Sequence, residues 1–355
     1  MNRKKAKKIA VAAVSCVLGA MMCFSATGCK PTPVPPTGDY YQETTVGTSA
    51  TKSGYTEANG KFYSDYKTLD DAHKAGKKLN IRLAEEGMVL MKNENGALPL
   101  NRDERNVTLL GIKSVDMQTG GGGSGNGYVG SDAAGSKYKI LPTSLEQSMT
   151  DAGFSLNEKV LDLYKANISA MSYEEFSEGS GCVQTLTREL PMSYYNDMIT
   201  KTYRAYDDAA IITFSRSGAE GLDHIAHEDS HVLQLTEEEI ALVKHAKANF
   251  KKVIVLLNTG NVMEVGELAA PKTESNLGVD AIIYVGHVGN DGAAAIGKIL
   301  NGEVNPSGRL VDLWPADITK EPSYTNFGDM GQNGEGYDNY IYNGNEKTNY
   351  HSVEY

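Results

Sequence analysis

Cysteine is scarce in this sequence, which has four cysteines in 355 residues. Cys16 and Cys23 lie in an apolar N-terminal stretch, so Cys29 and Cys182 are the two that remain after it. None of the spacings is that of a zinc site. We therefore expect a fold that is held by packing, without a structural metal.

Basic residues are few in the body of the chain. The net charge is −11, and the first 28 residues carry five basic side chains and no acidic one, so the remainder has a net charge of −16. Phosphate binding needs clustered Lys and Arg. This acidic body argues against nucleic acid as a partner and against a polybasic lipid-binding surface.

The apolar stretch at residues 9–24 is too short for a comfortable membrane span. Because it follows a basic start and precedes small residues, it has the layout of a secretory signal. Residues 26–29 resemble a bacterial lipoprotein cleavage box, in which Cys29 becomes the lipidated first residue. We predict a signal peptide at 1–28 and a lipid-anchored protein at the bacterial cell surface. The alternative is an ordinary signal peptide and a soluble product.

A Pro-, Thr- and Gly-rich segment at residues 29–60 predicts an extended tether. From residue 61 to 320, short apolar runs alternate with amphipathic segments. The patterns predict strands at 88–91, 107–112, 209–214, 253–257 and 281–285, and helices at 64–86, 142–152, 236–249, 263–270 and 291–300.

Nearly continuous apolar strands between amphipathic helices indicate a mostly parallel sheet that is covered on both faces. We predict an α/β fold, a three-layer α/β/α sandwich. Thr236 and Glu239 form a capping-box pattern at the start of one helix. Residues 160–206 are less regular and indicate an insertion across the sheet.

A glycine-rich run at 119–127 follows the predicted strand at 107–112. Glycine lets backbone approach a ligand closely. The run contains G-x-G-x-x-G, but no acidic residue follows a second strand at the dinucleotide spacing. No Lys-Ser or Lys-Thr follows either, which excludes a P-loop. A flexible connection and a nucleotide-binding loop stay open as alternatives.

Glu220 lies in a Gly-flanked loop directly after the predicted strand at 209–214. Ligands of open α/β sheets gather at the carboxyl ends of the strands. Glu220 is therefore a candidate functional carboxylate, although a single loop Glu is commonly solvated. Residues 258–261 are expected at the same sheet edge.

A polar cluster follows Glu220, made of His224, His227, Glu228, Asp229 and His231. Its spacing is not His-Glu-x-x-His. We expect a solvated loop rather than a metal site.

Taken in order, five segments resemble glycoside hydrolase family 3. Residues 85–100 look like the entry to the α/β sandwich domain of that family, residues 120–125 match its glycine loop, and residues 215–223 match its acid/base loop. Residues 253–261 and 302–309 match later signatures. The resemblance spans roughly 70–330. It implies a retaining, β-glucosidase-like hydrolase that acts on non-reducing-end β-linked sugars without a cofactor.

The same resemblance implies the site residues. Glu220 would be the catalytic acid/base. The substrate would be bound by Gly121, Gly122, Gly123, Ser124, Gly125, Arg216 and Asp223. Retention needs two carboxylates about 5–5.5 Å apart. A second carboxylate on the loop of Glu220 is not expected, because the sugar must lie between the two groups.

In this family the nucleophile is an Asp on a TIM-type barrel, which takes about 250 residues. The sequence has no room for one beside the sandwich. Some members carry the sandwich first and the barrel later, and an irregular tail at 321–355 fits that order. We expect the chain to supply the acid/base half-site and to be inactive alone. The alternative is a non-catalytic, carbohydrate-binding or partner-docking surface lipoprotein.

Overall fold

The computed structural model describes residues 55–56, 61–62, 65–121, 142–176, 183–218, 233–273, 275 and 277–320. It divides into two compact units, residues 1–72 and 73–355. In the first unit, strands β1 (Tyr55–Thr56) and β2 (Lys61–Phe62) pair antiparallel. Helix α2 (Leu69–Gly87) begins in the first unit and continues into the second.

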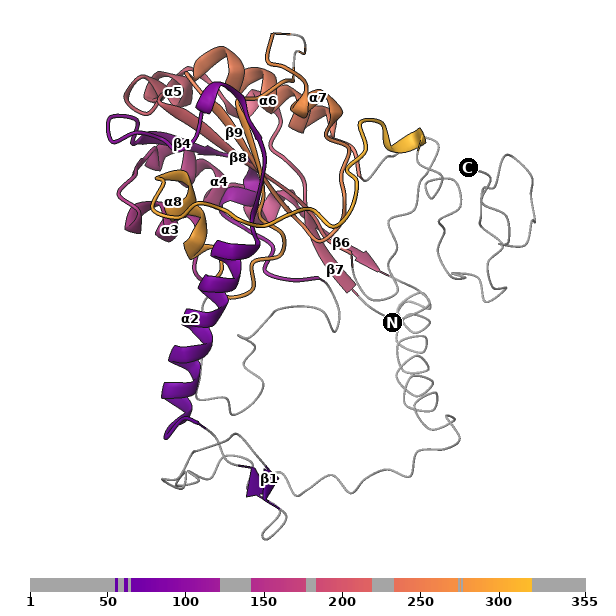
Figure 1. The fold of residues 1–355 in the computed structure, drawn as a ribbon. Coiled ribbons are helices and arrows are strands. Elements are labelled where there is room, and N and C mark those ends of the chain that lie inside the picture. Colours follow the sequence, from indigo (N-terminus) through magenta and orange to yellow (C-terminus); the bar gives the residue numbers. More distant parts are fainter. Residues whose placement is uncertain are drawn as a thin grey trace, which may run out of the picture. The chain divides into compact units, whose positions relative to one another are not determined.

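The second unit contains a six-stranded sheet with the order β3-β10-β9-β8-β4-β5 (Figure 1). Strand β3 is antiparallel to β10, and the other neighbours are parallel. The strands are β3 (Val89–Asn93), β4 (Asn106–Leu110), β5 (Ser155–Leu156), β8 (Ala209–Arg216), β9 (Val253–Thr259) and β10 (Ala281–Tyr284).

The helices of this unit lie between the strands along the chain. They are α3 (Leu145–Asp151), α4 (Glu158–Met171), α5 (Asp197–Thr200), α6 (Glu237–Asn249), α7 (Gly266–Ala269) and α8 (Ala294–Leu300). Short 3-10 helices are η1 (Glu94–Gly96), η2 (Ile112–Ser114), η4 (Met192–Tyr194), η5 (Lys201–Ala205) and η6 (Ile318–Lys320). A separate antiparallel hairpin pairs β6 (Ser172–Phe176) with β7 (Val183–Thr187).

Two hydrophobic cores lie on opposite faces of the sheet. Ile211, Ile254 and Ile283 belong to the core that includes α3 and α8, whereas the next residues along β8 and β9 belong to the core that includes α6. This alternation is expected when side chains point to both faces of a strand and both faces are buried. Figure 1 shows α3 and α8 together on one side of the sheet and α6 and α7 on the other. The three-layer α/β/α sandwich is confirmed.

Helix α6 begins as its sequence predicts. The Thr236 hydroxyl accepts a hydrogen bond from the Glu239 backbone N–H at 3.2 Å, and the Glu239 carboxylate accepts one from the Thr236 N–H at 2.8 Å. The reciprocal pair satisfies two N–H groups that the first helical turn would otherwise leave open. The predicted capping box is confirmed.

The region at 160–206 differs from the expected insertion. Helix α4 packs directly on the sheet through Val160, Leu161 and Tyr164, which are buried. It follows β5, which adds a parallel edge strand next to β4. Its hydrophobic period is short and is interrupted by Asn and Lys, which explains why the sequence pattern is weak.

Helix α2 lies where the sequence predicts a helix, and the leucines at 79 and 83 are not part of its packing face. Leu79 and Leu83 are 56% and 61% exposed, while Ala84 packs against the core and Asn80 bonds to the Val288 carbonyl and the Asp291 N–H. Among the residues described, no helix is both long enough and apolar enough to cross a membrane.

Two helical glycines predict opposite effects of a methyl group on stability. In α8, a Cβ at Gly297 would lie 2.3 Å from the Ser148 carbonyl oxygen and 2.7 Å from the Ala152 Cβ, whereas a Cβ at Gly76 would meet no atom within 4 Å. We expect Gly297→Ala to lower the free energy of unfolding by about 1–3 kcal/mol. Gly76→Ala should raise it by about 0.5–1 kcal/mol.

Urea unfolding of the two variants and the parent chain measures both effects. A Gly297→Ala chain as stable as the parent would contradict the close α3–α8 packing. A loss of stability in Gly76→Ala would contradict the open surroundings of Gly76.

Candidate active site at the carboxyl ends of the strands

Four parallel strands end together at one edge of the sheet. Ser215 and Arg216 of β8 lie opposite Asn258 and Thr259 of β9, and Tyr284 of β10 lies opposite Leu257. The exit of β4 reaches the same place, because Gln118 contacts Asn258. The predicted common edge for residues 258–261 and the end of β8 is therefore confirmed.

The side chain of Asn258 connects three of these exits. Its Oδ1 accepts a hydrogen bond from the Gln118 N–H at 2.6 Å, and its Nδ2 donates to the carbonyl oxygens of Gln118 at 2.9 Å and Gly286 at 2.7 Å. Asn258 is fully buried. Because a buried amide needs partners for its polar atoms, these bonds fix the backbone at residues 118 and 286.

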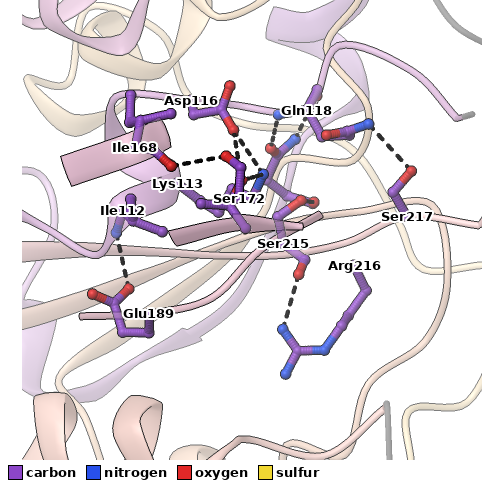
Figure 2. Close-up of polar contacts among 12 residues, drawn as sticks. Ile112, Lys113, Asp116, Gln118, Ile168, Ser172, Glu189, Ser215, Arg216 and Ser217 are labelled. Atoms are coloured by element: carbon purple, nitrogen blue, oxygen red, sulfur yellow. Dashed lines mark hydrogen bonds and ion pairs between the residues drawn. The ribbon is translucent and has the colours of Figure 1, made fainter. Parts of the chain in front are cut away.

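Gln118 in turn reaches the exit of β8. Its Nε2 donates to the Ser217 hydroxyl at 3.2 Å, a contact that Figure 2 shows between the two labelled side chains. The Ser215 hydroxyl donates to the Asn258 carbonyl at 2.7 Å. Gln118 and Ser217 each precede a sequence-predicted site residue, Gly121 and Glu220, by three positions.

Both flanks of the segment at 122–141 are tied to the connection between β10 and α8. The Gly289 N–H donates to the Thr119 carbonyl at 2.9 Å, and the Thr143 N–H donates to the Asn290 carbonyl at 2.7 Å. The Thr143 hydroxyl also donates to Asp291 at 3.2 Å. Thr119, at the start of the glycine run, and Thr143, after residues 122–141, therefore both lie beside the segment that joins β10 to α8.

Arg216 and Glu239 form a buried ion pair beside this edge. The two guanidinium nitrogens donate to the two carboxylate oxygens at 2.9 and 2.7 Å, and they also donate to the carbonyls of Ser215 and Gln234. The side chains are 10% and 9% exposed. A bidentate, charge-assisted pair of this kind fixes the end of β8 to the start of α6. Direct contact of Arg216 with substrate stays a prediction.

Breaking the pair from the acidic side tests this role. Glu239→Gln removes the carboxylate charge from the buried bidentate pair, so we expect the free energy of unfolding to fall by about 3–5 kcal/mol. Glu238→Gln is the matched control, because Glu238 is exposed on the same turn. It should change stability by less than about 0.5 kcal/mol. Equal losses in the two variants, measured by urea unfolding, would show that the pair is not the cause.

His287 lies against the start of the turn that follows β9. A Cβ built on Gly260 would come within 2.9 Å of the His287 Cε1 atom, so only glycine leaves room for the ring. Burial lowers the pKa of His287, and a hydrogen bond to the Arg216 backbone opposes that effect. Its Nε2 is buried and has no hydrogen-bond partner within the described part of the chain.

Glu189 is a buried carboxylate beneath the corner where β4 turns into η2. Its two oxygens accept hydrogen bonds from the N–H groups of Ile112 and Leu190, each at 2.8 Å (Figure 2 shows the bond to Ile112). The Tyr164 hydroxyl accepts a bond from the Gly111 N–H at 2.7 Å and pairs with the Tyr195 hydroxyl. Burial raises the pKa of Glu189 to about 7, although both backbone bonds favour the charged form.

The raised pKa predicts a pH dependence of stability. A folded-state pKa of about 7 against an ordinary glutamate pKa of 4.5 means that the folded chain keeps a proton that the unfolded chain releases. This contribution is present below pH 4.5 and is lost as the pH rises through about 7, a difference of roughly 3 kcal/mol.

Urea unfolding at pH 4.5 to 8 compares the parent with Glu189→Gln. The parent should lose stability relative to the variant as the pH rises, while the exposed Glu158→Gln control follows the parent. Parallel curves for parent and Glu189→Gln would contradict the raised pKa. Titration of His245 and His287 is common to all three chains and cancels in the comparison.

A small, partly open pocket lies next to the same strand ends. The Trp314 ring meets the Tyr284 ring edge to face at a centroid distance of 5.2 Å. Two apolar side chains of the adjoining segment are almost fully exposed, Val311 at 94% and Leu313 at 93%. The pocket lining consists of Gly87, Val89, Gly260, Asn261, Val262, Tyr284, Arg309, Leu310, Val311, Asp312 and Trp314.

Several sequence-predicted site residues lie outside the described residues. They are Glu220, Asp223, Gly122, Gly123, Ser124, Gly125 and Cys29, together with the cluster from His224 to His231. Gly121 is described and half-buried, two residues after Thr119, whose carbonyl accepts the bond from Gly289. The structure therefore shows the supports of both predicted loops, and the roles of the loop residues stay predictions.

The sequence pattern does not reveal the roles of Asn258, Gln118 and Glu189, and for Glu239 it reveals the helix cap but not the pairing with Arg216. Asn258 is the one with a visible signal, since it is a polar residue directly after five apolar ones. The others depend on partners 77 to 140 positions away or on a neighbouring element.

The fold and the arrangement of loops have counterparts among known proteins. Residues 88–350 match the glycosyl hydrolase family 3 C-terminal domain. The chain belongs to glycosyl hydrolase family 3. The match covers the sheet, both helical layers and every strand exit described above.

Characterised relatives of this family 3 chain include β-glucosidases. It is 32% identical over 243 residues to a β-glucosidase of Ruminococcus albus, covering 68% of this chain and 23% of that enzyme. It is 29% identical over 269 residues to β-glucosidase A of Butyrivibrio fibrisolvens, covering 70% and 30%.

A solved relative agrees in fold. β-Glucosidase 3B of Thermotoga neapolitana, in a complex with glucose, superimposes with a TM-score of 0.55 at 28% identity and covers 74% of this chain and 33% of that one. This family 3 chain thus spans about a quarter to a third of the length of these relatives.

Proposed function

We propose that this chain is the sandwich part of a retaining β-glucoside hydrolase and that Glu220 is its catalytic acid/base. The observation that carries the proposal is the family match over residues 88–350, together with the position of Ser217. Ser217 lies at the carboxyl end of β8, anchored to Gln118, and Glu220 follows three residues later. The proposed acid thus belongs to the edge where ligands of α/β sheets collect.

The proposed chemistry follows from the needs of a glycosidic bond. Glu220 protonates the leaving oxygen while an Asp nucleophile attacks the anomeric carbon, and Glu220 then removes a proton from water to release the sugar. The glycine run at 121–125 and Asp223 line the sugar pocket in this proposal. No cofactor takes part, because proton transfer and nucleophilic attack suffice for this reaction.

The proposed nucleophile comes from a TIM-type barrel domain, and this chain supplies the acid/base half of the site. Exposed apolar residues beside the pocket support such a companion. Val311 and Leu313 are 94% and 93% exposed, and Val311 lines the pocket together with Gly260 and Tyr284. Exposed apolar side chains beside a pocket are typical of surfaces that another module covers.

We also propose that the chain is exported and anchored by lipid at Cys29 on the bacterial cell surface. The support is the sequence alone, a basic and apolar start followed by the Ala26–Cys29 box. The residues 29–60 would then act as a tether between the anchor and the sandwich. Mass spectrometry of the membrane fraction, with Cys29→Ser as control, tests the acyl modification.

An activity assay tests the half-site. The chain from residue 30 onward should not hydrolyse 4-nitrophenyl β-glucoside alone and should do so when it is joined to a family 3 barrel domain that carries the nucleophile. Glu220→Gln in the joined protein should lower kcat by about 10²–10⁴-fold. The loss should be smaller for a dinitrophenyl glucoside, because that leaving group needs little protonation.

Glu228→Gln is the matched control, because it lies on the same segment. It should retain most of the activity. Strong Glu220-dependent turnover by the chain alone would contradict the need for a barrel. Turnover of the joined protein that does not respond to Glu220→Gln would contradict the acid/base role. Tight glucose or cellobiose binding by the inactive chain would favour a non-catalytic sugar-binding lipoprotein.

A further inference from the structure

One buried amide lies where the supports of the two proposed loops meet. Asn258 follows five apolar residues of β9 and is fully buried. Its neighbours in the sheet are β8, which leads to Glu220, and β10, and its side chain also contacts Gln118, which follows β4 and precedes the glycine run.

The side-chain amide of Asn258 forms its hydrogen bonds with backbone groups. Its oxygen accepts from the Gln118 N–H, and its two N–H groups donate to the carbonyls of Gln118 and Gly286. The reciprocal pair with Gln118 imitates one rung of a β-ladder. The two bonds therefore fix the position and orientation of the backbone at Gln118, three residues before Gly121.

The Asn258 contacts continue into the β8 exit. Gln118 donates to the Ser217 hydroxyl, and Ser215 donates to the Asn258 carbonyl. Ser217 is 4% exposed, so solvent does not compete strongly for this bond. A displacement of residue 118 would therefore break or shift its hydrogen bond to Ser217, three positions before Glu220.

Packing alone does not explain an asparagine at this position. Residues 253–257 are apolar and fully buried, and an apolar side chain of similar size would continue that run. A buried amide is favourable only when its partners are in place, and it then selects one arrangement of the surrounding chain. Here that arrangement is the relative placement of two loop bases.

We propose that Asn258 is a positioning residue that holds the base of the glycine run and the base of the acid/base loop in fixed register. The inference rests on the proposed function for its catalytic consequence, and on the hydrogen bonds at Asn258 for its structural one. In the assembled enzyme, Asn258 fixes the position of residue 118 relative to residue 217, from which the two proposed loops continue. It does not contact the substrate.

Asn258→Asp tests the inference with little change in shape. The carboxylate still accepts from the Gln118 N–H, but it cannot donate to the carbonyls of Gln118 and Gly286. Leu256→Ala is the matched control, because Leu256 is fully buried in the same strand and its side chain is outside this hydrogen-bond group. It should destabilise the core without altering the amide.

Hydrogen exchange of the chain measures the structural part. After correction for global stability, Asn258→Asp should speed amide exchange by at least about tenfold in residues 115–121 and also in residues 215–218. Leu256→Ala should change neither segment beyond its global effect. Faster exchange at 115–121 alone would overturn the coupling between the two bases, and unchanged exchange in both would overturn the positioning role.

Kinetics of the chain joined to a barrel domain measure the catalytic part. Asn258→Asp should lower kcat by about 10²-fold with little change in KM, because small misplacement of a reacting group has this effect. The loss should depend on the leaving group as it does for Glu220→Gln. A loss no larger than that of Leu256→Ala would overturn the catalytic consequence.

The two measurements separate the possible failures. If the joined parent protein hydrolyses no β-glucoside, the proposed function fails, and hydrogen exchange still decides whether Asn258 links the two bases. If the parent is active and exchange is unchanged by Asn258→Asp, the positioning role fails while the proposed function stands.

Discussion

Burial of the central strands on both faces is the constraint on which the rest of this structure depends. Strands β8, β9 and β10 have helices on both sides, so side chains along their central parts are buried and mostly apolar. Polar residues can begin where the strands end. Because the strands are parallel, these ends meet at one edge, and chain segments distant in the sequence become neighbours there.

The same constraint explains the character of the residues at that edge. Ser215, Asn258 and Gln118 use hydrogen bonds to backbone, and Arg216 uses a bidentate pair with Glu239. Each polar group is placed where water is largely excluded, so its partners must be supplied by the protein. The result is a rigid base beneath the loops that carry the proposed chemistry, and rigid support is what a proton donor needs for repeated alignment with a sugar.

Glu189 and the tyrosines beside it are a second group of buried polar side chains whose partners are supplied by the protein. They support the corner after β4 from below, with a carboxylate in a desolvated position and hydroxyl groups bonded to one another. Burial raises the pKa values of Tyr164 and Tyr195, so both hydroxyls stay protonated and can donate. The N–H groups of the corner are therefore bound by a neutral hydroxyl acceptor, Tyr164, and by the Glu189 carboxyl group, whose pKa is about 7.

Local patterns in the sequence determined five of the six strands of the main sheet, most of the helices, the capping box at Thr236 and the sandwich architecture, because these depend on the period of apolar residues and on short-range hydrogen bonds. They also indicated the common edge at which the end of β8 meets Asn258 and Thr259. Tertiary structure decided that α4 packs on the sheet, that Leu79 and Leu83 are exposed, and that Arg216 pairs with Glu239. It also decided that Asn258 binds Gln118, which lies 140 residues away. Such pairings have no local period, since they exist only after parallel strands bring remote segments to one edge.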